Sequence, residues 1–175
     1  TLADLKLFPA TSRIHFVECS GNGGSEYSGN LAPDPQQSHG LASCSEWTGV
    51  PVRLLLAEAK LKPEAKWIIA EGADACHLTR SIPIAKVLAD AMIASAQNGE
   101  PIRPAQGYPM RLRLPGWEGN THTKWLRRLH LAAGPATTAR ATAHPTAPPP
   151  TGTAPPVPPR ARAQDDPRAR ARRRH

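Results

Sequence analysis

The clearest strand signal of this chain is Arg13-Ile14-His15-Phe16-Val17-Glu18-Cys19, which is followed directly by Ser20-Gly21-Asn22-Gly23-Gly24. Apolar and β-branched residues are concentrated in the first segment, as is typical of a strand, and the glycines mark its end. Cys19 therefore lies at the start of a long loop over residues 20–40, where the glycines let a bulky ligand approach the backbone. Its thiolate can act as a nucleophile or a soft-metal ligand. The alternative is a small buried hydrophobic residue.

The rest of residues 1–131 carries both helix and strand patterns, which indicate a mixed α and β fold. A helix is expected over residues 52–61, where apolar residues recur at helical spacing after Pro51. A second helix is expected over residues 84–96. Strands are expected over 67–70, over 110–114, where apolar residues alternate with Arg111 and Arg113, and over 124–131, with Trp125, Leu129 and Leu131 on one face.

Four basic residues lie on or near the last two expected strands: Arg111, Lys124, Arg127 and Arg128. They either grip an anionic ligand together or form a solvated basic face. Cys44 and Cys76 are expected to be small core or loop residues.

The composition divides the 175-residue chain into two parts. Residues 133–175 contain ten of the 20 prolines, eleven alanines, eight of the 22 Lys and Arg residues and two of the 14 acids. The tail therefore carries +6 of the +8 net charge. Because Val157 is its only large apolar residue, the tail cannot offset its ordering entropy and is expected to be disordered. The basic balance of the whole chain thus gives no reason to expect nucleic-acid binding.

Several classes of protein are excluded by the sequence. No apolar run approaches the roughly 20 residues of a membrane span. Three cysteines do not make a disulfide framework, and no zinc or phosphate-loop motif occurs. The chain begins at Thr1 with no signal peptide, so we expect a fragment or a processed product.

The chain contains seven short motifs in this order: Cys19-Ser20-Gly21-Asn22, Ser45-Glu46-Trp47-Thr48-Gly49-Val50-Pro51, Glu71-Gly72-Ala73-Asp74, Arg80-Ser81-Ile82-Pro83, Gln106-Gly107-Tyr108-Pro109-Met110-Arg111, Pro115-Gly116-Trp117-Glu118-Gly119-Asn120 and Lys124-Trp125-Leu126. Together they resemble the molybdopterin domain of the sulfite oxidase family, most closely the molybdenum subunit of Sox-system sulfite/sulfane dehydrogenases. The resemblance covers residues 1–131. It implies an α+β fold, a mixed α/β molybdopterin-binding domain incomplete at both ends, followed by a disordered tail over 132–175.

The resemblance also implies a cofactor and the residues that bind it. In this family a mononuclear molybdenum is held by the dithiolene of one molybdopterin, by oxo groups and by one protein cysteine, whose position Cys19 matches. Asp74 matches the acid that hydrogen-bonds the pterin, and Arg111 matches an arginine in contact with the cofactor. Thr123, Lys124 and Trp125 match a triplet that grips the cofactor. Gln106 stands where sulfite oxidases proper have a histidine, and it is expected to bind the cofactor as well.

The function implied is oxidation of a sulfur substrate, either sulfite or protein-bound sulfane sulfur, with electrons passed to a c-type cytochrome. Gly23 and Gly24 stand where sulfite oxidases proper have anion-binding arginines, which favours a sulfane or thiosulfate-derived substrate. The alternative within the family is a sulfite:cytochrome c reductase. The parent enzyme is expected in the periplasm, with no membrane partner.

This sequence also departs from the family. It lacks a segment before the cysteine, a substrate-site tyrosine and an immunoglobulin-like dimerisation domain, so we expect an impaired enzyme that retains little or no molybdenum. The tail resembles the product of a GC-rich gene read out of frame. The competing interpretation is a non-enzymatic, degenerate fragment that binds polyanions through a basic arm.

Overall fold

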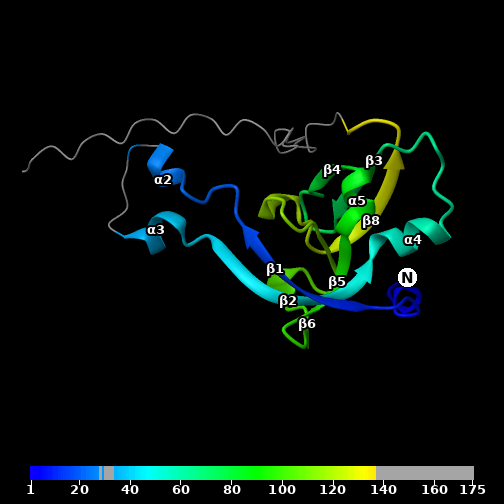
Figure 1. Cartoon of the computed structure of the whole chain (residues 1–175), viewed down its shortest axis with the longest axis horizontal. Coiled ribbons are helices and arrows are strands. Elements are labelled where there is room, and N and C mark those ends of the chain that lie inside the picture. The colour runs from blue at the N-terminus through cyan, green and yellow to red at the C-terminus, as the bar shows by residue number, and fades with distance from the viewer. Residues whose placement is uncertain (28, 30–33, 137–175) are drawn as a thin grey trace, which may run out of the picture. The chain divides into compact units, whose positions relative to one another are not determined.

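Two antiparallel sheets and a set of short helices make up the part of the chain that the structure describes (Figure 1). The structure is a computed structural model and describes residues 1–27, 29 and 34–136, which all belong to one compact unit. The tail expected to be disordered lies, from residue 137 onward, outside the described residues. None of the helices described has the length and apolar character needed to span a bilayer. The mixed α and β fold expected from the sequence is confirmed.

The larger sheet is built around a long two-stranded ribbon (Figure 1). β1 (Thr11–Glu18) lies at the edge and pairs with β2 (Ala42–Pro51) along its whole length. β5 (Met92–Gln97) pairs with β2 on one side and with β6 (Glu100–Pro101) and β7 (Arg111–Arg113) on the other. One end of the ribbon leads into α2 (Gly24–Tyr27) and α3 (Pro35–His39). Cys19 follows β1 at this end.

The smaller sheet has the strand order β4-β3-β8, formed by Thr79–Pro83, Trp67–Gly72 and Leu126–Ala132. It meets the larger sheet next to β7. There the Leu112 amide donates to the carbonyl oxygen of Thr123, and the Leu126 amide donates to that of Met110, both at 2.9 Å. The segment that leads into β8 is therefore fixed against β7.

One apolar core joins the two sheets to α4 (Val52–Glu58) and α5 (Ile84–Asp90), and α1 (Leu2–Leu5) closes one side of it. Burying each large aliphatic side chain contributes roughly 1.5–3 kcal/mol. The most deeply buried apolar members are Val52, Ile68, Ile82, Val87, Leu112 and Leu114. A second, smaller cluster contains Trp47 of β2, Met92 and Ala94 of β5, and Ile102, which follows β6. Trp47 is thus a core residue.

Several expected elements are confirmed, with shifted boundaries. The strand predicted to end at Cys19 is β1, the helix after Pro51 is α4, and the strands predicted near residues 67, 110 and 124 are β3, β7 and β8. The prediction that Trp125 shares a strand face with Leu129 and Leu131 is wrong. It precedes β8 with a positive φ of 48°.

Other expectations are wrong. The helix predicted over residues 84–96 ends at Asp90, Ala91 is extended, and the rest is β5. Pairing with β2 and β7 overrides the helical pattern there, as tertiary context often does. The loop over residues 20–40 contains two short helices, and no strand was predicted at β2, β4 or β6. Cys44 is an exposed strand residue, whereas Cys76 lies in a loop.

Candidate functional site

Cys19 lies immediately after β1 with an exposed, free thiol. Its amide donates to the carbonyl oxygen of Leu41 at 2.9 Å, which ties the strand end to the segment before β2. The amide of Gly21 points back at Cys19 Sγ at 3.5 Å. A cysteine sulfur is a soft metal ligand, and Sγ is accessible at this position.

The loop after Cys19 is fixed by the side chain of Asn22. Its Nδ2 donates to Glu18 Oε1 at 2.8 Å, and its Oδ1 accepts from the Leu41 amide at 3.0 Å. Asn22 thereby clamps both strands of the ribbon where they end. The position of the thiol is set by hydrogen bonds on both sides, although the loop is exposed.

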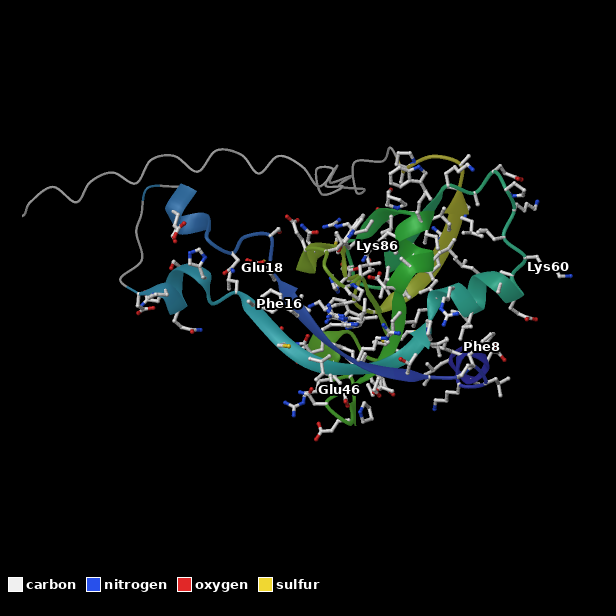
Figure 2. All side chains as sticks on the ribbon, viewed as in Figure 1. Phe8, Phe16, Glu18, Glu46, Lys60 and Lys86 are labelled. Atoms are coloured by element: carbon white, nitrogen blue, oxygen red, sulfur yellow. The ribbon has the colours of Figure 1, made fainter. Side chains whose placement is uncertain are left out.

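The thiol opens into a cleft of about 360 Å³ between the end of β1 and the segment that follows β7. Figure 2 shows Phe16 and Glu18 at this end of β1. A Cβ atom on Gly119 would lie 3.1 Å from the carbonyl oxygen of Glu18 and 3.5 Å from Cys19 Cα, so the two segments pack closely here. The lining residues are Phe16, Glu18, Cys19, Ser20, Asn22, Gly116, Trp117 and Glu118.

Arg111, at the start of β7, is buried rather than solvated. Its Nη1 donates to the backbone oxygen of Gln106 at 2.9 Å and to Gln106 Oε1 at 3.1 Å, and its Nη2 donates to the backbone oxygen of His122 at 3.2 Å. Desolvation lowers the pKa of Arg111 to about 10, so it remains a cation at neutral pH. The solvated basic face considered for β7 is therefore wrong.

Gln106 and the segment before β8 are held together through η1 (Pro104–Gln106), a 3₁₀ turn. Lys124 Nζ donates to the backbone oxygen of Ala105 at 3.1 Å, and Trp125 Nε1 donates to that of Pro104 at 3.0 Å. Lys124 Nζ also lies 4.6 Å from the centre of the Trp125 ring. The structure thus brings Gln106, Arg111, Lys124 and Trp125 together, as the sequence predicted for one site.

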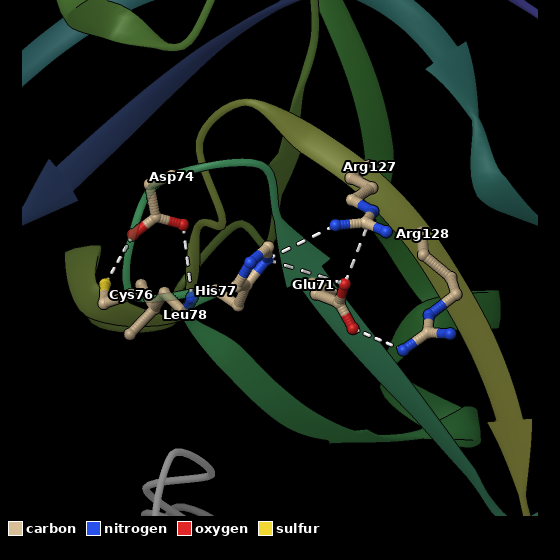
Figure 3. Close-up of polar contacts among 7 residues, drawn as sticks. All are labelled: Glu71, Asp74, Cys76, His77, Leu78, Arg127 and Arg128. Atoms are coloured by element: carbon tan, nitrogen blue, oxygen red, sulfur yellow. Dashed lines mark hydrogen bonds and ion pairs between the residues drawn. The ribbon is translucent and has the colours of Figure 1, made fainter.

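Asp74 lies in the loop after β3 (Figure 3). Its Oδ1 accepts from the Leu78 amide at 3.1 Å, and its Oδ2 accepts from the Cys76 thiol at 2.6 Å. The hydrogen bond from Cys76 lowers the pKa of Asp74. A Cβ atom on Gly72 would lie 2.6 Å from Asp74 Oδ1 and 3.0 Å from the backbone oxygen of Lys124. Asp74 and Lys124 are therefore neighbours.

Arg127 and Arg128 on β8 are not part of this group. Arg128 Nη2 donates to Glu71 Oε2, and Arg127 Nε lies 3.5 Å from Glu71 Oε1 (Figure 3). Because Glu71 is nearly buried and takes up both arginines, these two cations neutralise an internal carboxylate. These contacts give no support to the interpretation that Arg127 and Arg128 bind an external anion together with Arg111.

Two buried residues of the site had no assigned binding role from the sequence. His122 is 2% exposed; its Nδ1 accepts from the Leu114 amide at 3.4 Å and its Nε2 donates to the backbone oxygen of Trp117 at 3.0 Å. Desolvation, followed by the positive charge of Arg113, lowers the pKa of His122 to about 3. His122 is therefore neutral and supports the wall of the Cys19 cleft. Arg113 is fully buried, which its alternation with apolar residues did not reveal.

His122 links the Cys19 cleft to Arg111. The backbone oxygen of His122 accepts a hydrogen bond from Arg111, and its ring Nε2 donates one to the backbone oxygen of Trp117, which lines the cleft. The fold is a mixed α and β domain with an exposed thiol at the end of β1, joined by hydrogen bonds to the buried Arg111. A family model described as the oxidoreductase molybdopterin binding domain matches residues 1–139, and the chain belongs to this family. The resemblance inferred from the seven motifs is confirmed.

Individual relatives agree with this assignment. The chain is 33% identical over 141 residues to the mitochondrial sulfite oxidase of Drosophila melanogaster, covering 75% of this chain and 25% of that protein. It is 38% identical over 104 residues to a nitrate reductase [NADPH] of Phytophthora infestans, covering 54% of this chain and 12% of that protein. The crystal structure of the sulfane dehydrogenase SoxCD from Paracoccus pantotrophus matches with a TM-score of 0.74 and 48% identity, over 77% of this chain and 34% of that chain.

The residues present fit the cofactor of this family, molybdenum with molybdopterin, which carries a phosphate and many hydrogen-bonding atoms. Among the buried side chains described, Arg111 Nε and Thr123 Oγ1 have no hydrogen-bond partner. Buried polar atoms normally have partners, so these atoms favour a bound polar group. The unpaired atom of Arg111, Nε, is a donor, as an anionic group requires. Direct contact with the cofactor stays a prediction for seven residues: Cys19, Asp74, Gln106, Arg111, Thr123, Lys124 and Trp125.

Proposed function

We propose that this chain is the molybdopterin-binding part of an enzyme that oxidises a sulfur substrate, sulfite or protein-bound sulfane sulfur. The observation that supports this proposal most strongly is the 48% identity to the sulfane dehydrogenase SoxCD, over 77% of this chain. The nitrate reductase match is less similar and shorter. The chain spans about a third of the SoxCD chain and a quarter of the sulfite oxidase, so the activity belongs to the whole protein.

Cys19 is proposed to hold the molybdenum through its thiolate. The Gly21 amide lies 3.5 Å from Sγ, and the two hydrogen bonds of Asn22 fix the loop that carries the thiol at the cleft. When bound, the cofactor supplies oxygen-atom transfer and two-electron chemistry, while the protein supplies binding and orientation.

Arg111 and Lys124 are proposed to hold the anionic parts of the cofactor. Arg111 is positioned by Gln106 and His122, and Lys124 by Ala105. Asp74, whose pKa is lowered, stays ionised and can accept hydrogen bonds from a pterin. The neutral ring of His122 adds no further charge and holds Trp117 against the cleft.

The substrate proposal depends on Gly23 and Gly24. A Cβ atom on Gly24 would meet nothing within 4 Å, so this position leaves space beside the thiol loop. Open space without a charged side chain suits a bulky sulfane or thiosulfate-derived substrate better than free sulfite. We further propose that the parent enzyme works in the periplasm and passes its electrons to a c-type cytochrome.

The test uses the whole protein that carries this chain, purified with its cofactor. Reduction of a c-type cytochrome is measured with sulfite and with thiosulfate-derived substrates. In a separate assay, oxidation of the reduced cytochrome is measured with nitrate as the oxidant. We expect turnover with a sulfur substrate and none with nitrate; nitrate reduction without sulfur oxidation would overturn the proposal. Cys19→Ser should abolish turnover because it removes the thiolate, while Cys44→Ser, at an exposed cysteine on β2, should retain it.

A further inference from the structure

Arg113 has the most deeply buried charged side chain in the described part of the chain. It is 0% exposed, and none of its three guanidinium nitrogens has a hydrogen-bond partner. A guanidinium carries five N–H donors and no acceptor. Burying a charge without partners is strongly unfavourable unless something compensates for the lost water. Some interaction must therefore offset the cost of removing the Arg113 guanidinium from water.

The indole of Trp47 provides part of that compensation. The Cζ atom of Arg113 lies 4.2 Å from the centre of the Trp47 ring, and that of Arg111 lies 5.2 Å from it. Both distances are in the range of cation–π contacts. Such a contact uses the face of the guanidinium and leaves its in-plane N–H groups unpaired. Trp47 Nε1 is also buried without a partner.

The charges around Trp47 are not balanced. Within the described residues no carboxylate lies within ion-pair distance of Arg111 or Arg113. Burial and the positive charge of Arg111 lower the pKa of Arg113 to about 9, which still leaves both arginines charged at neutral pH. The nearby His15 is buried, and desolvation followed by Arg113 lowers its pKa. Two adjacent buried cations thus lack a counter-charge.

The unpaired atoms specify the chemistry of a missing partner. They are Nε of Arg111, three nitrogens of Arg113 and Nε1 of Trp47, and each of them is a donor. A partner must therefore be negative and offer several acceptors close together. An oxoanion, with three or four equivalent oxygens, meets this requirement, and arginine pairs are well suited to bind it.

We propose that Arg113 and Arg111, on the ring of Trp47, form an oxoanion-binding site. The family motifs assign a role to Arg111 alone, so Arg113 is the new element. The oxoanion has two sources, the phosphate of the molybdopterin or a free sulfur oxoanion. The site does not depend on the proposed function, because anion binding can be measured without turnover.

The test uses the purified 175-residue chain without cofactor. Sodium phosphate, sodium sulfate and sodium sulfite are titrated against sodium chloride at matched ionic strength, and binding is followed by calorimetry and by thermal unfolding. We expect saturable binding that Arg113→Leu weakens by about tenfold or more, since a charge-assisted fork is lost. Arg53→Leu removes the same charge from an exposed position on α4 and should leave binding unchanged.

The outcomes separate the sources and the alternatives. Preference for phosphate indicates the cofactor phosphate, and preference for sulfate or sulfite indicates a sulfur oxoanion; either result supports the site. No saturable binding, or equal binding by Arg113→Leu and the wild type, overturns it and leaves Arg113 as a core cation stacked on Trp47. Should Arg113→Leu not fold, the change in tryptophan emission on anion binding is measured instead. That change must then disappear in Trp47→Phe, and its persistence overturns the site.

Discussion

The Cys76 thiol donates a hydrogen bond to the carboxylate of Asp74, with 2.6 Å between Sγ and Oδ2. The carboxylate stabilises the protonated thiol, so this contact raises the pKa of Cys76 and lowers that of Asp74. An acid predicted to bind the pterin is therefore coupled to an exposed cysteine two residues away. The coupling gives the Asp74 loop a chemical signature that can be measured without cofactor.

We expect Asp74→Asn to make Cys76 react faster with iodoacetamide at pH 8. Loss of the negative charge returns the pKa of Cys76 toward its ordinary value, which increases the reactive thiolate. Alkylation rates are measured by peptide mass spectrometry. Cys44, exposed on β2, serves as the internal control and should keep its rate. An unchanged rate at Cys76 would show that the contact with Asp74 is not formed in solution.

A second prediction concerns the turn that holds Lys124. Gly107 has a φ of 106°, and a Cβ atom there would lie 2.9 Å from Lys124 Cβ and 3.0 Å from the amide nitrogen of Trp125. Gly107→Ala combines backbone strain with a clash against a fixed segment, so we expect it to lower the free energy of unfolding by about 2–4 kcal/mol. Urea denaturation measures the change.

Gly99→Ala is the matched control for this substitution. Gly99 also has a positive φ, 79°, but a Cβ atom there would meet nothing within 4 Å. We expect it to cost about 1–2 kcal/mol, the penalty of the left-handed backbone alone. An equal loss in the free energy of unfolding at the two positions would mean that Gly107 does not pack closely against Lys124 and Trp125 as the structure shows.

The sequence was sufficient where the signals are local. The β-branched segment before Cys19 and the glycines after it place the thiol at a strand end, and pairing with β2 only extends that strand to Thr11. The helix after Pro51 is local in the same sense. The motifs brought Gln106, Arg111 and Lys124 into one predicted site, and hydrogen bonds around η1 join them.

The elements that were missed depend on partners far along the chain. β2 has an exposed outer face with Cys44 and Glu46, and it is a strand because β1 and β5 pair with it. Residues 92–97 follow a helical pattern but lie between β2 and β7. Arg113 contradicts the general rule that arginine is almost never fully buried unless paired, so its alternation with apolar residues gave no sign of its burial.

A third prediction concerns the hydrogen bonds of Arg111. Arg111→Lys keeps the charge but cannot donate to Gln106 and His122 in the same fork. We expect a loss of about 1–3 kcal/mol in the free energy of unfolding, as for one or two hydrogen bonds of a charged group. Chemical denaturation measures it, with Arg53→Lys on exposed α4 as the control. Equal stability of both variants would contradict the geometry around Gln106.

The last prediction follows from the neutral state of His122, whose pKa is lowered to about 3 by burial and by Arg113. In the unfolded chain a histidine titrates near 6.5, so below that pH the unfolded state binds a proton that the folded state cannot. Stability should therefore fall as the pH decreases from about 6.5 toward 3, by up to about 1.4 kcal/mol per pH unit for this group. Urea unfolding at pH 7 and pH 5 measures this loss of stability.

His122→Gln keeps a donor and an acceptor without titrating. We therefore expect the variant to lose about 2 kcal/mol less of its free energy of unfolding between pH 7 and pH 5 than the wild type does. A His122→Gln variant with the wild-type pH dependence would mean that His122 is protonated in the folded protein.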